Sequence, residues 1–137
     1  MSEKSGQQGS LIRVSHVVVL KNAKGEVLFL KHRGGKWLFP GGRLKVGEKW
    51  IDGLHREVEE ETGIKNFEIT KVLEVDSWDH GGEPHYGVFF LAETGTTEVT
   101  LSDEHIDSLW TADPDQIDKL DFWNPALSRI AKSALGV

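Results

Sequence analysis

The stretch from Gly41 to Ile64 constrains this chain more than any other part of the sequence. It begins with two glycines, passes through a short polar loop and continues into a helical pattern over residues 49–62. Gly63 stands where a helix-terminating residue is expected. The residues predicted to face the core are Trp50, Ile51, Leu54 and Val58. The stretch therefore predicts a glycine-bounded loop followed by one amphipathic helix.

Three glutamates share one face of the predicted helix. Glu57, Glu60 and Glu61 are spaced i, i+3 and i+4, which makes them neighbours on a helix surface. Carboxylates this close repel one another, and Arg56 alone cannot neutralise all three. A bound divalent cation would neutralise them. An isolated acidic run is more often a solvated surface, but the glycines, Glu48 and Arg56 at fixed spacing favour a metal site here.

The spacing in this stretch resembles the Nudix box. Gly42 is followed after five residues by Glu48, and after seven more by Arg56, which opens the run REVEEETGI ending at Ile64. Every specified position of the box is filled, and the preceding WLFPGG resembles the segment that usually leads into it. The resemblance implies an α/β fold, an α/β/α sandwich with a mixed β-sheet between helices. It also implies hydrolysis of a nucleoside diphosphate linked to another moiety.

The residues of the box have expected roles in that reaction. Mg²⁺ and Mn²⁺ prefer oxygen ligands and bridge phosphate oxygens readily. A cation held there would neutralise developing charge, lower the pKa of a bound water and align its attack on phosphorus. Arg56 and Glu48 are interpreted as a supporting pair that orients the loop against the helix. The expected metal ligands are the carboxylates of Glu57, Glu60 and Glu61 and, by the resemblance, the carbonyl of Gly41.

A fourth carboxylate is expected from a distant loop. In many members of the family such an acidic residue completes the site or acts as the base. Glu104, six residues before Trp110, is the candidate here, and an ordinary surface position is an equal alternative. Glu83, in a loop predicted over residues 79–84, is its rival. The general base therefore stays unassigned at this stage.

Substrate contacts are predicted from side chains near the loops. Arg33, at the end of a predicted strand, and Arg43, inside the glycine-bounded loop, are candidates for phosphate contact. For each arginine, a solvated surface position without a substrate role is an equal alternative. His80 and His85 flank a glycine-rich loop and are candidates for packing on a base or sugar, although a lone histidine is more often structural or at the surface. Trp78, near the same loop, is a candidate for stacking on a base.

The remaining chain predicts a single domain over residues 11–137, after a flexible polar tail over residues 1–10. Strands combined with one central and one terminal helix predict a mixed sheet covered on both faces. The predicted strands cover residues 11–20, 26–33, 37–39, 67–78, 85–93 and 106–110, and further helices begin near Pro114 and Pro125.

Composition excludes several classes of protein. The chain has no cysteine, which excludes disulfides, thiolate zinc sites and a cysteine nucleophile. It has no apolar run of the ~20 residues that a membrane-spanning helix needs, and its first residues lack the apolar core of a secretory signal. We therefore expect a soluble, cytoplasmic protein. The net charge of −6 argues against general nucleic-acid binding. The expected partner is therefore a small nucleotide substrate. A homodimer is also compatible with the sequence.

The leading hypothesis is a Mg²⁺- or Mn²⁺-dependent pyrophosphohydrolase that releases a nucleoside monophosphate and a phosphorylated product. Nucleotide sugars, (d)NTPs and similar compounds are all open as substrates. A catalytically silent nucleotide-binding sensor is a second hypothesis, which predicts a degraded box. An RNA 5′-end pyrophosphohydrolase is a third, which predicts a basic path for RNA on the surface.

Overall fold

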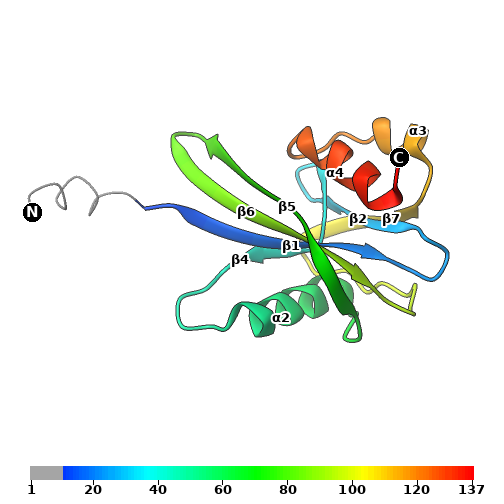
Figure 1. Ribbon diagram of the computed structural model, residues 1–137, viewed down its shortest axis with the longest axis horizontal. Helices are drawn as coiled ribbons and strands as arrows, with labels where there is room; N and C mark the ends of the chain where they lie inside the picture. The colour runs from blue at the N-terminus through cyan, green and yellow to red at the C-terminus, as the bar shows by residue number, and fades with distance from the viewer. Residues whose placement is uncertain (1–10) are drawn as a thin grey trace, which may run out of the picture.

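The structure, a computed structural model, describes residues 11–137, so the tail predicted over residues 1–10 lies outside the described residues. One seven-stranded mixed sheet has α2 on one face and α3 and α4 on the other (Figure 1), which confirms the predicted α/β class. The elements in chain order are β1 (Arg13–Lys21), β2 (Val27–His32), β3 (Trp37–Leu38), β4 (Gly41–Arg43), α2 (Trp50–Thr62), β5 (Glu68–His80), β6 (Glu83–Glu93), β7 (His105–Thr111), α3 (Pro114–Asp118) and α4 (Ala126–Leu135).

Strand β1 is the centre of the sheet. It runs parallel to β6, from Arg13 opposite His85 to Lys21 opposite Glu93, and antiparallel to β2 and β4. The order of the strands is β3-β2-β1-β6-β5, with β4 added to β1 and β7 added to β2. The near-continuous apolar run in β1 suits this position, because a central strand is buried on both faces.

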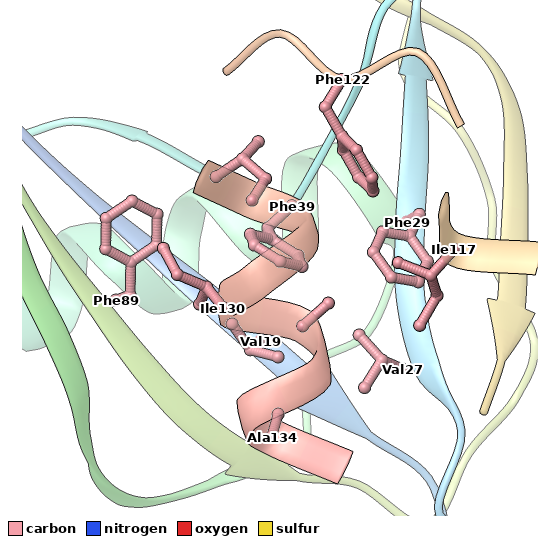
Figure 2. Packing of buried hydrophobic residues seen from close by; sticks show 11 residues of the cluster. Val19, Val27, Phe29, Phe39, Phe89, Ile117, Phe122, Ile130 and Ala134 are labelled. Carbon is pink, nitrogen blue, oxygen red and sulfur yellow. The ribbon is translucent and has the colours of Figure 1, made fainter. Parts of the chain in front are cut away.

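Side chains of β1 point alternately to two separate cores. Val19 belongs to the cluster under α4, whereas Val18 and Leu20 belong to the cluster under α2. Figure 2 shows the α4-side cluster, in which the ring of Phe29 lies near those of Phe39 and Phe122. Its centroid is 5.6 Å from that of Phe39 and 5.7 Å from that of Phe122. These rings join β2, the chain before β4 and the chain before α4 in one apolar layer.

Helix α2 ends as predicted, at Gly63. This residue is left-handed, with φ of 75°, and its N–H donates to the carbonyl of Glu59 at 2.8 Å. Leu54 and Val58 are buried as predicted, but Trp50 is 45% exposed. Its ring stacks on Phe90 with 5.0 Å between centroids, so only one face of the indole is covered. None of the helices formed by residues 11–137 is long and apolar enough to cross a membrane.

The loop predicted over residues 79–84 is wrong in its extent. Strand β5 continues to His80 and β6 begins at Glu83, which leaves Gly81 and Gly82 as a two-residue turn. Both glycines have positive φ, 60° and 85°. A hairpin turn with two positive φ values matches the twist of its strands, so the strands continue to the turn itself.

Replacing Phe29 by alanine tests this layer. The buried ring lies between two others, so we expect the free energy of unfolding to fall by about 3–5 kcal/mol. Urea denaturation measures the loss. Ile106→Ala is the matched control, because Ile106 is 52% exposed in β7 and should cost less than about 1 kcal/mol. Equal losses in both variants would contradict the described core.

Candidate functional site

Two glutamates of α2 converge on the two glycines of β4. The side chain of Glu61 is buried, and its Oε1 accepts a hydrogen bond of 3.0 Å from the N–H of Gly41. The carboxylate of Glu57 lies against Gly42, where a Cβ would stand only 2.2 Å from Glu57 Oε2. A side chain at this position of β4 would therefore displace the Glu57 carboxylate.

These glycines belong to strand β4 rather than to the predicted loop. β4 pairs antiparallel with β1, with Val17 opposite Gly41 and Ser15 opposite Arg43. Gly41 has φ of 142°, and a Cβ there would be 2.4 Å from the carbonyl oxygen of His16. Only glycine fits between β1 and the helix. The ladder with β1 also fixes the main chain that the two carboxylates meet.

Arg56 is the centre of a network of ion pairs. Its Nε and Nη2 donate to the two oxygens of Glu48 at 2.8 and 2.9 Å, and its Nη1 donates to Glu60 at 3.0 Å. The Nη2 atom of Arg56 also lies 3.5 Å from Glu57 Oε1. The guanidinium holds the pKa of Glu48 below its ordinary value. The bidentate pair fastens the loop before α2 to the helix.

The two converging carboxyls have unusual proton affinities. Burial is the main cause that raises the pKa of Glu61 to about 8, and the hydrogen bond from Gly41 opposes it. The negative charges of Glu57, Glu104 and Glu60 raise it further. Burial also raises the pKa of Glu57, although Arg56 lowers it. The surrounding protein thus stabilises the ionised forms of these two carboxyls only in part, and below about pH 8 Glu61 is mainly protonated when no cation is bound.

The three glutamates expected to bind metal are not gathered at one point. Within residues 11–137, no three or more His, Cys, Asp or Glu side chains are arranged to hold a metal ion. Glu57 and Glu61 meet at β4, but Glu60 turns to Arg56 and its side chain is 60% exposed. The donors at β4 are nevertheless hard oxygens whose ionised forms the protein alone stabilises only in part. They fit a divalent cation such as Mg²⁺, which takes one or two carboxylates and keeps several waters.

The loop before β7 reaches the same site. Glu104 lies close enough to Glu61 for its charge to raise the pKa of that carboxyl. The carbonyl of Glu104 accepts a hydrogen bond of 3.0 Å from the N–H of Arg33, and the Nε of Arg33 donates to the carbonyl of Asp103. Arg33 therefore holds this loop in place.

The other expected site residues lie near the β5–β6 hairpin and β4. Glu83 forms an ion pair of 2.8 Å with Arg13. Arg43 is exposed at the end of β4. His85 is buried, with its ring stacked on Trp78 at 5.5 Å between centroids. Its Nε2 has no hydrogen-bond partner among the described residues.

An apolar cavity lies on the other side of the β4 glycines. It has a volume of about 160 Å³, and Gly41 and Gly42 form part of its wall. Trp78, Phe89 and Trp123 give it an aromatic lining. The glycine pair is therefore a thin partition, with two carboxylates on the α2 side and an aromatic cavity on the α4 side.

Asn124 brings a polar group to this cavity. Its Oδ1 accepts a hydrogen bond of 2.9 Å from the N–H of Ala126 at the start of α4. This bond fixes the orientation of the amide and leaves its NH2 group as a donor. Sequence reasoning missed Asn124 and Trp123, because they lie far along the chain from the glycines, and no local pattern marks them.

Comparison with known proteins identifies the family. A family model of the NUDIX domain matches residues 11–132, so the chain belongs to the Nudix family. The box between Gly42 and Ile64 is thus correctly recognised. The solved structure of a MutT protein from Methanosarcina mazei Go1 has a TM-score of 0.78 and 24% identity, over 92% of this chain and 94% of that one. This likeness confirms the predicted sandwich fold.

Curated relatives share part of their length with this chain. An RNA pyrophosphohydrolase from Psychrobacter sp. (strain PRwf-1) is 34% identical over 62 residues, which are 44% of this chain and 36% of the relative. An 8-oxo-dGDP phosphatase from Danio rerio is 32% identical over 99 residues, 67% of this chain and 30% of the relative. The chain spans about a third of the length of these two relatives.

The raised pKa of Glu61 predicts how the metal-free protein responds to pH. The folded pKa of about 8 exceeds the ordinary value of about 4.3, so the folded state binds more protons between these values. The contribution of the neutral carboxyl is complete below about pH 4 and is lost as the pH rises through 8. We therefore expect the free energy of unfolding to fall from pH 5 to about pH 8.

Glu61→Gln provides the control for this pH prediction. It keeps an acceptor for the N–H of Gly41 but cannot ionise. Urea denaturation in EDTA at a series of pH values should show a difference between the two proteins that changes over this interval. A constant difference would contradict the raised pKa.

Proposed function

We propose that this chain is a divalent-metal-dependent pyrophosphohydrolase. It cleaves the pyrophosphate bond of a nucleoside diphosphate linked to another moiety, and it releases a nucleoside monophosphate and a phosphorylated product. The observation that carries this proposal is the convergence of Glu57 and Glu61 on Gly41 and Gly42, with an aromatic cavity behind them. The names of the two curated relatives agree with this class of reaction.

We assign the cation, Mg²⁺ or Mn²⁺, to Glu57 and Glu61. The Gly41 carbonyl and the Glu60 carboxylate complete the protein ligands, the latter after it leaves Arg56. The bound ion supplies charge neutralisation at the phosphate oxygens and a more acidic water. Glu61 must lose its proton to bind it, so metal affinity rises with pH up to about 8.

The supporting residues have separate roles in this proposal. Arg56 orients Glu57 and fastens the loop through Glu48. Glu104 is the fourth carboxylate, either as a further ligand or as the base that accepts a proton from the attacking water. Arg33 acts through Glu104, because it holds the loop before β7.

The cavity behind the glycines is proposed to hold the nucleobase. Trp78 and Trp123 offer aromatic faces for stacking, and the Asn124 NH2 group offers a hydrogen bond to a base carbonyl. The ring of His85 stacks on Trp78 and holds the indole in place. A nucleotide seated there carries its phosphates past Gly42 toward the carboxylates, and the exposed Arg43 contacts the distal phosphate.

A substrate panel tests the proposed reaction. Wild-type protein with Mg²⁺ or Mn²⁺ should hydrolyse nucleotide sugars, (d)NTPs or other nucleoside diphosphate derivatives that differ in base and leaving moiety. Glu57→Gln and Glu61→Gln should each lower kcat about 10²- to 10³-fold, because each removes charge that holds the cation. Release of the nucleoside monophosphate and of the phosphorylated product is the measurement.

Glu59→Gln is the matched control for this panel. It is the same substitution on the same helix, and Glu59 has only a distant ion pair of 3.9 Å with Lys65. Its kcat should equal that of the wild type. If wild type and Glu61→Gln bound a nucleotide but showed equally negligible turnover on every compound, the protein would be a silent sensor.

Gly42→Ala tests whether the position of Glu57 matters. The new Cβ would overlap the Glu57 carboxylate, which must then leave its place beside Gly42. We expect Mn²⁺ affinity and kcat to fall about 10- to 100-fold. Calorimetric Mn²⁺ titration and turnover are the measurements. Gly95→Ala, where a Cβ meets nothing within 4 Å, should change neither value. A Gly42→Ala protein with wild-type Mn²⁺ affinity would exclude Glu57 as a ligand.

A further inference from the structure

Strand β5 has a free edge. Among the described residues it pairs only with β6, and it is the last strand of the path β3-β2-β1-β6-β5. With 13 residues it is long for an edge strand. A long edge presents unpaired N–H and C=O groups to any strand that can approach it.

Exposed apolar side chains lie beside this edge. Register with β6 places Val72 opposite Phe90, a member of the α2-side core, and Val75 points to the same face. Trp50 stacks on Phe90 next to them. The exposed fractions are 52% for Val72, 52% for Val75, 45% for Trp50 and 42% for Tyr86. This is the kind of surface that a partner covers.

A β-bulge gives β5 an unusual order of side chains. The register shifts between Val72 and Glu74. Glu74 lies opposite Phe89, and Leu73 packs against the same α4-side cluster as Phe89, so two successive residues point to one face. From residue 71 to residue 76 the side chains therefore face α4, α2, α4, α4, α2 and α4. The order is the same in both directions.

This order permits a symmetric pairing that a regular strand cannot make. Antiparallel strands related by a two-fold axis perpendicular to the sheet place residues of one face opposite each other. With the axis between two residues, a regular strand would oppose residues of different faces. In β5 the bulge removes this conflict when the axis lies between Leu73 and Glu74.

The same axis brings complementary side chains together. Lys71 comes opposite Asp76 of the partner subunit, and Val72 comes opposite Val75 of the partner subunit. Each pair occurs twice because of the symmetry. Lys71 and Asp76 form no ion pair within residues 11–137, and Lys71 is exposed. Opposite charges and apolar pairs directly across two strands are stabilising.

We propose that β5 pairs antiparallel with β5 of a second copy of this chain, about a two-fold axis between Leu73 and Glu74. The two sheets become one continuous sheet across the dimer. This inference does not rest on the proposed hydrolysis, because Glu57, Glu61 and Gly42 lie on other elements. Bulges and lysines also serve to keep edge strands unpaired, and that alternative predicts a monomer.

Charge exchange across the axis tests the dimer. The chain has a mass of 15.3 kDa, and light scattering after size exclusion should give about twice this value for the wild type. Lys71→Asp and Asp76→Lys each place two like-charge pairs in the interface. Each should raise the dissociation constant of the dimer at least about 10-fold. The double variant Lys71→Asp/Asp76→Lys restores both pairs and should restore the dimer.

Controls separate this pairing from other effects. Lys24→Asp makes the same charge change in the β1–β2 turn and should leave the mass unchanged. Thermal unfolding of each variant confirms that it is folded. A monomeric wild type, a dimer that neither single variant weakens, or a folded double variant that stays monomeric would each overturn the proposal. Loss of hydrolysis with an intact dimer would count only against the proposed function.

Discussion

The close approach of α2 to β4 is the contact on which the rest of the site depends. Two residues without side chains let the carboxylates of Glu57 and Glu61 reach a strand of the sheet. Burying such groups costs free energy unless a cation or protons compensate. The hydrogen bond from Gly41 and the guanidinium of Arg56 compensate in part, and the high pKa of Glu61 records the remainder. The fold thus keeps two carboxyls at β4 whose ionised forms the protein alone does not fully stabilise.

The mixed sheet makes this contact possible. β1 pairs with β4 and β6 at the same level, where Val17 is opposite both Gly41 and Phe89. The two glycines therefore pair with the middle of β1, and β6 pairs with the other edge of β1 at the same residues. Helix α2 covers one face and the chain leading to α4 covers the other, so both faces of β4 are enclosed.

Local sequence predicted the parts of the molecule that short-range chemistry determines. Gly63 ends α2 because its left-handed backbone lets its N–H donate to the Glu59 carbonyl, and the spacing of the box identifies the family from the sequence alone. The parallel pairing of β1 with β6 and the cavity residues Trp123 and Asn124 were not predicted, because they depend on contacts between distant segments. The orientation of Glu60 was missed for another reason, since helical spacing does not reveal competition by Arg56.

In the proposed function, the two glycines of β4 separate the cation site from the site of the nucleobase. Carboxylates stand on one side of β4, and the aromatic cavity with Asn124 stands on the other. Trp78, Trp123 and Asn124 line the cavity without contributing to the contact between the glycines and the two carboxylates. Under that proposal, changes in the chain before α4 would alter which ligand fits the cavity, while the acidic helix stays the same. A designer could use the same division and re-line the cavity without rebuilding the acidic helix.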